Sequence, residues 1–549
     1  MEILEFFKIL IHFSIISFLA YFLAGYLHRI FFSPFAFQAK AEDFILQGLG
    51  VDSKVTQSPK EYFLSLLSFH VLGFLLLFSL LVFQNHLAFN PQSLPGLPLD
   101  LAFNITVSFL TNTNWQSYSG ESTLSYTSQF LGLGVQNFFS PAAGIAVFLV
   151  LVRSFQFQKN REFGNFYVDV FRAILWVLLP LSLLVAVLLM NEGVIQNFRE
   201  YIPLADGRLF PGGPAASQIA IKQVGTNGGG FFGVNSLHPL ENPSSFSNLV
   251  EIYALLLLPI SFPFLFGKGI GKEKEGIILY SLMTILLLIG IGISLHFEMS
   301  QVVAGHSPVL EGKDSRFSIA DSVFWAVSTT ATSNGSVNAM HDSFSAISVL
   351  VLLFNMLTGE VIFGGVGCGM YGMVLYAILT VFISGLMIGR TPEYLGRKIG
   401  AKEIQLSSLG LLFPSVAILT FLSFAVMSSD ALSSRTNLGP RGLSEMLYAF
   451  ASALGNNGSA LGGLNANTMF YNMLLGVGML LGRFVVMFSV FFLASSFLGK
   501  KIVEESLGTF HTDTVLFLFL LLFVIFLVGA LTFFPVLLLG PFLEHFLLP

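Results

Sequence analysis

The sequence is poor in charge. Only 10% of its 549 residues are Asp, Glu, Lys or Arg, whereas a soluble chain of this length would carry roughly 25%. Most of the surface is therefore expected to face something other than water. The 31 acidic and 26 basic residues nearly balance, so the chain offers no strong basic field, and we expect no nucleic-acid partner.

Cysteine is almost absent as well. The single cysteine, Cys368, excludes a disulfide framework and a thiolate metal cluster. The few charges inside the apolar stretches are isolated from one another. An integral membrane enzyme would need titratable groups converging at one depth, so we find no support for that class of function.

Long apolar stretches take the place of charge, and 54% of the residues are hydrophobic, including 61 Phe. A helix needs about 20 apolar residues to cross a bilayer. The expected fold class is an all-α polytopic membrane protein with ten transmembrane helices. The stretches are 3–30, 62–86, 130–152, 172–191, 248–267, 276–297, 343–389, 409–430, 468–498 and 513–540.

Two of these stretches need comment. The first has no basic region or small-residue cleavage site of a signal peptide, so we expect a retained helix. The seventh, 343–389, is too long for one crossing and is interrupted by the glycine-rich residues 358–369. We expect a broken helix with an irregular segment inside the membrane, although close helix packing is an alternative use for these glycines.

Lys and Arg gather in alternate loops, which predicts that those loops are cytoplasmic and that both termini lie outside. The residues of this set are Arg29, Lys40, Lys54, Lys60, Arg153, Lys159, Arg161, Arg172, Lys268, Lys272, Lys274, Arg390, Arg397, Lys398, Lys402, Lys500 and Lys501.

The opposite loops contain a repeated pattern: a short apolar segment that ends in small polar residues and glycine. The four segments are 110–116, 225–230, 331–336 and 454–459, roughly 105 to 125 residues apart, as expected of an internal repeat. We therefore divide the chain into a first helix with its cytoplasmic loop (1–60), four repeats (61–160, 161–272, 273–400, 401–505) and a last helix (506–549).

Four such loops around one axis predict a cation filter. An ion crossing lipid must exchange its water shell for other oxygens, and backbone carbonyls can supply them. Glycine permits the unusual backbone that this requires, and the C-terminal end of each short helix favours a cation. The segments contain no Asp or Glu, which suits a monovalent ion better than calcium. Lys222 is the one Lys or Arg within five residues of them. Glycines that merely let helices pack closely are the alternative.

At these loops the sequence resembles the A subunit of the Kdp-type potassium-transporting P-type ATPase, in the superfamily of potassium transporters. The resemblance spans essentially the whole chain and is carried by 112–116, 225–232, 338–342 and 455–459. It implies that the filter is lined by Asn112, Thr113, Asn114, Gln116, Thr226, Asn227, Gly228, Thr332, Ser333, Asn334, Gly335, Gly455, Asn456, Asn457 and Gly458.

The resemblance also implies the setting. The transported ion would be K⁺, with no organic cofactor, and the partners would be a catalytic P-type ATPase subunit, two small membrane subunits and membrane lipid in the bacterial inner membrane. The ion would enter from outside and pass sideways to the ATPase subunit. The tetrapeptide Asp-Lys-Thr-Gly of P-type ATPases is absent, so this chain is not expected to be catalytic. A stand-alone potassium or sodium symporter or channel of the same superfamily remains the alternative.

The loops depart from the Thr-Val-Gly-Tyr-Gly of tetrameric potassium channels, and the first loop lacks even the central glycine. Arg483 lies inside an apolar stretch, where arginine usually faces a cavity or partner. We expect it to contact the segment around Glu360 and gate the path to the cytoplasm, unless it forms a structural ion pair or snorkels.

Gly364 and Gly365 would lie beneath the filter. Glu360 and Arg390 could border a lateral exit path, or simply be solvated or packed. Asp342 is expected to cap a helix that follows the third loop.

Overall fold

The computed structural model describes residues 2–156, 163–300, 309–359, 361–389, 391–503 and 510–547. Within these ranges, ten helices are long and apolar enough to cross a membrane. They are α1 (Glu2–Phe32), α3 (Pro59–Val82), α6 (Gly134–Phe155, extended by Ser128–Leu133), α7 and α8 (Phe166–Arg172 and Leu179–Asn191, continuous through Ala173–Leu178), α10 (Ser245–Ile270), α11 (Glu273–Ser300), α14 (Cys368–Ile388), α15 (Ala401–Met427), α18 (Met469–Leu498) and α19 (Val515–Leu537).

Short turns of 3₁₀ or π type lie at Gln84–His86, Asn235–Leu237, His341–Ser343 and Leu538–Phe542. The remaining α-helices and strands are short. They are α2 (Ala36–Gly48), α4 (Leu99–Leu110), α5 (Gly120–Thr123), α9 (Ala215–Val224), α12 (Ile319–Ala331), α13 (Ala346–Leu357), α16 (Ser429–Ser433), α17 (Gly439–Gly455), α20 (Leu543–Leu547), and the strands β1 (Ile202–Pro203), β2 (Leu209–Phe210), β3 (Glu393–Tyr394) and β4 (Arg397–Lys398). Each strand pair is an antiparallel hairpin.

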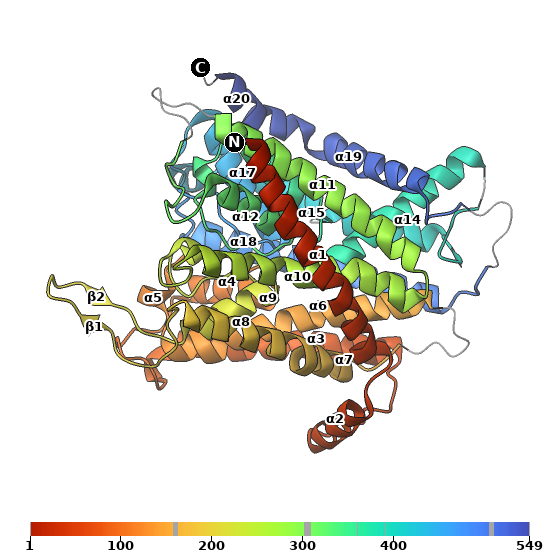
Figure 1. Ribbon diagram of the computed structural model, residues 1–549, viewed down its shortest axis with the longest axis horizontal. Coiled ribbons are helices and arrows are strands. Elements are labelled where there is room, and N and C mark those ends of the chain that lie inside the picture. Colours follow the sequence, from red (N-terminus) through yellow and green to blue (C-terminus); the bar gives the residue numbers. More distant parts are fainter. Residues whose placement is uncertain are drawn as a thin grey trace.

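The ten expected stretches are confirmed. The seventh is broken as expected: α13 ends at Leu357 and α14 begins at Cys368, and only α14 counts among the ten helices found in the described ranges. Figure 1 shows the long helices lying side by side, with both chain termini at the same end of the bundle and the β1–β2 hairpin projecting from that end.

The long helices form an inner and an outer layer. In the apolar windows of α6, α10, α14 and α18, 56–83% of residues are buried, against 33–44% in α3, α8, α11 and α15. Each of the four repeats thus contributes one inner and one outer helix, and α1 and α19 lie at the two ends of the series. This arrangement brings the four loops that precede the inner helices toward one central axis.

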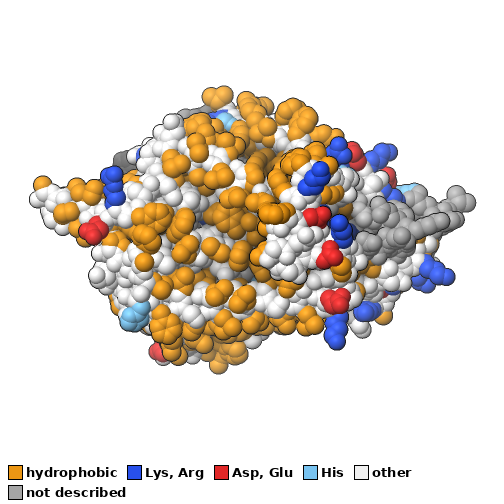
Figure 2. Space-filling view, turned by 90° about the horizontal axis from the view of Figure 1, so that it is seen from below, with side chains coloured by type: hydrophobic (Ala, Val, Ile, Leu, Met, Phe, Trp, Pro, Cys, Tyr) orange, Lys and Arg blue, Asp and Glu red, His pale blue; other side chains and the backbone are white. Residues whose placement is uncertain are grey.

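The outer surface fits a bilayer. Figure 2 shows apolar side chains over the middle of the face in view, while Lys, Arg, Asp and Glu gather near one end of the molecule. Exposed Leu, Phe and Ile side chains are abundant along α1, α3, α8 and α19. An apolar belt of this kind would be an aggregation hazard in water and is stable in lipid.

Candidate functional site

Four short helices end at one place in the fold. α4, α9, α12 and α17 stop at Leu110, Val224, Ala331 and Gly455, and each leads directly into one of the four repeated loops. Local sequence also fixes where such a helix begins; in α12, for example, Ser318 caps the start by accepting a hydrogen bond from Asp321 N at 3.1 Å. The four C-terminal ends, with their partial negative charge, therefore lie beside the loops.

Each loop has three positions that match across the repeats. The first position is Asn112, Thr226, Ser333 or Asn456; the second is Thr113, Asn227, Asn334 or Asn457; the third is Asn114, Gly228, Gly335 or Gly458.

All four first-position residues have left-handed φ values of 49–66°, and all four third-position residues have φ values of 53–95°. The residues between them do not. The four loops, although they differ in sequence, thus share one alternating backbone conformation, which α-helices and β-strands do not contain.

The third-position glycines close the loops into a ring. A Cβ on Gly228 would lie 1.7 Å from Asn334 O, one on Gly335 would lie 2.2 Å from Asn457 O, and one on Gly458 would lie 1.8 Å from Thr113 O. Loop 2 thus packs against loop 3, loop 3 against loop 4, and loop 4 against loop 1. No side chain fits at these contacts, so glycine is required there for space as well as for its φ value.

The first loop completes the ring without a glycine. Asn112 Nδ2 donates to Thr226 O at 2.9 Å, and Gln116 forms two hydrogen bonds with the Gly230 backbone, each 2.9 Å long. Asn114 keeps the left-handed φ that its position requires, and its amide donates to Asn137 Oδ1 at 2.8 Å. Asn is among the non-glycine residues that adopt this conformation most readily.

The amides at the second position hold neighbouring repeats together. Asn334 Nδ2 donates to Lys222 O at 3.3 Å and Asn457 Nδ2 donates to Thr329 O at 3.0 Å, each in the last turn of the preceding short helix. Both side chains are fully buried. These two amides therefore join the third loop to α9 and the fourth loop to α12.

The residues at the edges of the loops are also held by hydrogen bonds. Thr332 Oγ1 donates back to Ser328 O at 2.8 Å, and Gly455 is the last residue of α17. Ser333 Oγ donates to Asn456 O at 2.9 Å, which joins the third loop to the fourth.

The one Lys near the loops is neutralised. Lys222 is completely buried and forms an ion pair with Glu241. Its ammonium also donates to Asn235 Oδ1 and Ser236 Oγ, both at 2.8 Å. Asn235 in turn donates to Gly228 O at 2.6 Å. A buried cation is tolerated only when it is paired and hydrogen-bonded. The carboxylate of Glu241 therefore neutralises the positive charge of the Lys222 ammonium.

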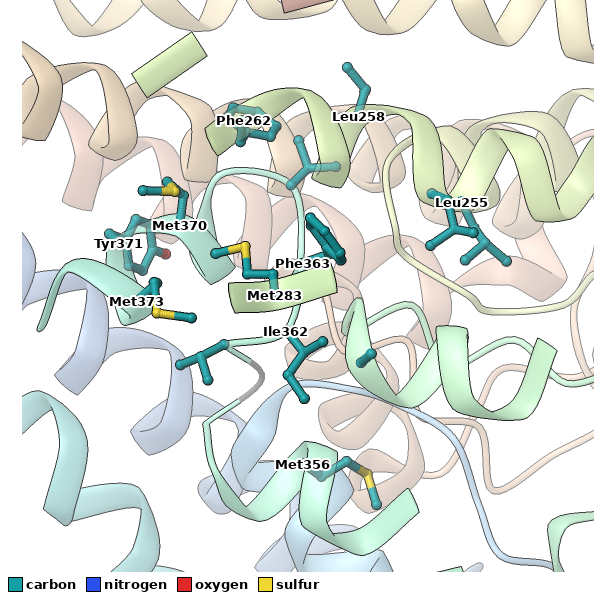
Figure 3. Packing of buried hydrophobic residues seen from close by; sticks show 14 of the residues in the cluster. Leu255, Leu258, Phe262, Met283, Met356, Ile362, Phe363, Met370, Tyr371 and Met373 are labelled. Atoms are coloured by element: carbon teal, nitrogen blue, oxygen red, sulfur yellow. The ribbon is translucent and has the colours of Figure 1, made fainter. Parts of the chain in front are cut away.

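The break between α13 and α14 lies directly against the loops. Val366 N donates to Thr226 Oγ1 at 2.9 Å, and a Cβ on Gly365 would lie 3.2 Å from the Ser333 side chain. Gly364 packs against Gly369. Figure 3 shows the segment running through buried apolar side chains, with Ile362 and Phe363 among residues of α10, α11 and α14. Irregular backbone is tolerated at this depth because it is enclosed in protein.

Arg483 lies at the end of that break. Its guanidinium contacts Cys368 Sγ, at the first residue of α14, and donates to Ser140 O on α6 at 3.1 Å. This contact is with the C-terminal end of the broken segment, at Cys368, whereas the expectation placed it around Glu360. Glu360 and Arg390 lie outside the described residues.

A small cavity opens beside the ring. Its volume is about 70 Å³, enough for a few water molecules. Its lining includes Ser333, Asn456, Thr358, Cys368 and Arg483. The cavity thus connects the inner side of the third and fourth loops with the α13–α14 break.

Sequence reasoning missed several polar residues that hold the loops. Asn137, Asn235 and Trp325 all bond to them; Trp325 Nε1 donates to Ser336 O at 2.9 Å. A polar residue in an apolar helix, such as Asn137 in α6, was the available signal. The expected cap at Asp342 is wrong: only a 3₁₀ turn, His341–Ser343, begins there, and Asp342 accepts from Arg441 Nε at 2.9 Å.

This ring, carried by ten membrane-spanning helices found in the described ranges, defines a single-chain membrane transporter of the four-pore-loop class. The chain belongs to the potassium-transporting ATPase A subunit family, whose model matches residues 10–546.

Curated relatives in this family are similar over nearly their full length. The chain is 52% identical over 516 residues to the potassium-transporting ATPase potassium-binding subunit of Leptospira interrogans, covering 92% of each chain. It is 49% identical over 506 residues to the protein of that name from Pseudomonas fluorescens (90% of each), and 46% over 556 residues to that of Clostridium botulinum (95% and 96%).

A solved structure supports the fold. The potassium transporter TrkH from Vibrio parahaemolyticus superposes with a TM-score of 0.53 at 16% identity, over 88% of this chain and 97% of that one. At this identity the likeness concerns the fold alone.

Proposed function

We propose that the ring of loops is a selectivity filter that binds K⁺ and that the chain delivers the ion to a separate ATP-hydrolysing subunit. The observation that carries this proposal is the closed contact of each third-position glycine with a carbonyl of the next loop. In this proposal the contact supports an arrangement in which main-chain oxygens of the four repeats surround one axis and replace the water of a monovalent cation. The relatives are named as potassium-binding subunits of a potassium-transporting ATPase.

The electrostatics of the ring support a monovalent cation. Four helix C-termini favour positive charge at the centre. The first position of each loop is neutral; its residues are Asn112, Thr226, Ser333 and Asn456. The pairing of Lys222 with Glu241 removes the nearest fixed positive charge, which would otherwise repel K⁺ at low dielectric.

The proposed setting is the bacterial cytoplasmic membrane, with the loops and both termini on the outer side. The gathering of Lys and Arg in the alternate loops supports this orientation, and Figure 1 draws both termini at the loop end. The proposed division into repeats keeps the boundaries 61–160, 161–272, 273–400 and 401–505, each with one loop of the ring.

The proposed route leads sideways from the filter to a catalytic P-type ATPase subunit, with two small membrane subunits completing the assembly. The cavity behind the third and fourth loops supports a lateral path, since Arg483 and the α13–α14 break lie in its lining. In this proposal Arg483 blocks direct passage to the cytoplasm, and Gly364 and Gly365 let the break approach the filter. Glu360 and Arg390 stay candidates for the border of the exit path.

The test is K⁺ uptake by cells that carry Gly228→Ala. The added Cβ would collide with Asn334 O and move at least one proposed ligand, so we expect the K⁺ concentration for half-maximal uptake to rise at least about tenfold, equivalent to about 1.4 kcal/mol. Gly193→Ala is the matched control, because Gly193 also has a left-handed φ, +96°, yet has open space around it. Unchanged uptake in Gly228→Ala, with assembly intact, would remove the second loop from the filter.

A further inference from the structure

Helix α2 (Ala36–Gly48) has the opposite polarity to a helix on a water-exposed surface. Two of its polar residues, Gln38 and Glu42, are buried together with Leu46, and Gln38 and Glu42 have only 0% and 1% of their surface exposed. Phe37 and Phe44, in contrast, are 62% and 82% exposed. A helix on a water-exposed surface buries its apolar face and exposes its polar face. The environment outside α2 is therefore expected to be apolar.

The polar side of α2 is fixed to the protein. Glu42 forms an ion pair with Arg172 of α7 at 2.8 Å. Gln38 Nε2 donates to Glu42 Oε1 at 2.7 Å and to Ile30 O of α1 at 3.2 Å. These contacts set the rotation of the helix, so its outward side cannot turn back into the bundle without breaking a buried ion pair, which would be costly.

The outward side carries an amphipathic stripe. Phe37, Ala41, Phe44, Ile45 and Gly48 are spaced at i, i+4, i+7, i+8 and i+11, which places them along one side of a helix. Lys40 and Gln47, both exposed, border this stripe. Apolar residues next to a basic margin are typical of helices that lie in a membrane interface.

The position of α2 is that of the membrane boundary. Only residues 33–35 separate it from the end of membrane-spanning α1. Phe37 packs edge-on against Trp176, with ring centroids 5.8 Å apart, and Tyr26 donates to Trp176 O at 2.8 Å. Trp and Tyr gather at the level of the lipid headgroups. Figure 1 shows α2 standing off the bundle on the side of α7.

We propose that α2 is an interfacial helix that lies in the lipid leaflet at this end of the bundle, with Phe37 and Phe44 among the upper acyl chains and Lys40 among anionic headgroups. Arg29, in the last turn of α1 and exposed, adds positive charge beside it, whereas Lys54 forms an ion pair with Asp43 of α2 at 3.7 Å. The assignment of this leaflet as the cytoplasmic one rests on the orientation proposed above. The proposed contact of α2 with lipid does not depend on that orientation.

The test uses the full chain in nanodiscs that contain anionic and zwitterionic lipid. A fluorescent label is attached to Phe44→Cys or, as the matched control on the same helix, to Gln47→Cys. The unsubstituted protein, whose one cysteine is Cys368, gives the background. Nitroxide groups high on the acyl chains should quench the Phe44→Cys label at least threefold more than the Gln47→Cys label, and aqueous iodide should show the reverse order.

Two outcomes would overturn the proposal. Equal iodide quenching at the two positions would place Phe44 in water. Protection of the Phe44→Cys label from both quenchers would mean that protein covers it. The same measurement is made on the chain assembled with its co-purified partners, to decide whether lipid or a partner subunit covers α2 in the complex. Nitroxide quenching of the Phe44→Cys label should persist in the complex. Loss of this quenching would overturn the proposal for the complex.

The headgroup contact has its own test. Lys40→Gln should reduce lipid quenching of the Phe44→Cys label at least twofold in anionic nanodiscs and leave it unchanged in purely zwitterionic ones. An identical effect of Lys40→Gln in both lipids would show that anionic headgroups are not recognised.

Discussion

At the scale of single residues, the filter depends on a few backbone conformations that most side chains resist. The third position needs a left-handed φ in every loop, and glycine supplies it in three of them. Asn114 supplies it in the first, with a φ of 53° and an amide bonded to Asn137. The loop that departs most in sequence thus keeps the same backbone.

This equivalence predicts the effect of substitutions at Asn114. Asn114→Gly loses one hydrogen bond, about 1 kcal/mol, and should keep K⁺ uptake within a few-fold of the wild type. Asn114→Val also forces a β-branched residue into the left-handed region, a further cost of about 1–2 kcal/mol. Thermal unfolding of the purified protein should rank wild type, Gly and Val in that order. A Val variant as stable and active as the Gly variant would contradict the shared backbone.

His341, just beyond the third loop, predicts a pH effect on stability. Burial lowers its pKa from the ordinary 6.5 to about 3, and its Nδ1 lies 2.8 Å from the Tyr448 hydroxyl. The folded protein therefore keeps this ring neutral, whereas the unfolded chain takes up a proton below pH 6.5. Its contribution is fully present above that pH and is lost as pH falls toward 3, by about 2 kcal/mol at pH 5.

The measurement is the melting temperature at pH 7.5 and pH 5. The wild type should lose more stability on acidification than His341→Gln, which cannot take up a proton. Comparing the two proteins removes the contributions of the other histidines. An equal loss in both would show that His341 is solvated in the folded protein.

At the scale of elements, the break between α13 and α14 joins the filter to the rest of the bundle. Val366 reaches the second loop, and Arg483 of α18 links the start of α14 to Ser140 of α6. One guanidinium thus spans three inner helices beneath the ring. Intramembrane arginine is costly and is kept where it has a partner or faces a cavity.

This link predicts a leak when it is removed. Arg483→Ala should raise passive K⁺ flux into K⁺-free vesicles at least about fivefold, roughly 1 kcal/mol of lost barrier, because the side chain no longer fills the space beside the cavity. Arg483→Lys, which keeps the charge but not the planar fork, should leak less. Flux in Arg483→Ala at the wild-type level, with uptake also unchanged, would end the proposal that Arg483 gates the path.

At the scale of the whole molecule, four repeats in one chain imitate a fourfold ring while differing in detail. The family relationship extends over residues 10–546, so the ring and both terminal helices belong to one unit. The relatives are named as the potassium-binding subunit of a potassium-transporting ATPase.

We therefore expect the tagged chain to co-purify with a larger subunit that is phosphorylated on aspartate. In that complex, Gly335→Ala, which would place a Cβ 2.2 Å from Asn457 O, should raise the K⁺ concentration that half-maximally stimulates ATP hydrolysis at least about tenfold. Full-rate K⁺ transport by the chain alone in vesicles would instead favour a stand-alone transporter.

The sequence by itself determined the membrane spans, the break in the seventh stretch and the four loops. Hydropathy and the positions of glycines are local properties of the sequence, so they can be recognised without any knowledge of tertiary contacts. It did not determine that Gly228 meets Asn334 O, that Asn114 replaces a glycine, that Glu241 neutralises Lys222, or that α2 turns its aromatic rings outward. These facts depend on which surfaces meet in the folded chain, over separations from 19 residues, for Lys222 and Glu241, to 130, for Glu42 and Arg172. Packing decides which surfaces meet, and the local sequence does not show it.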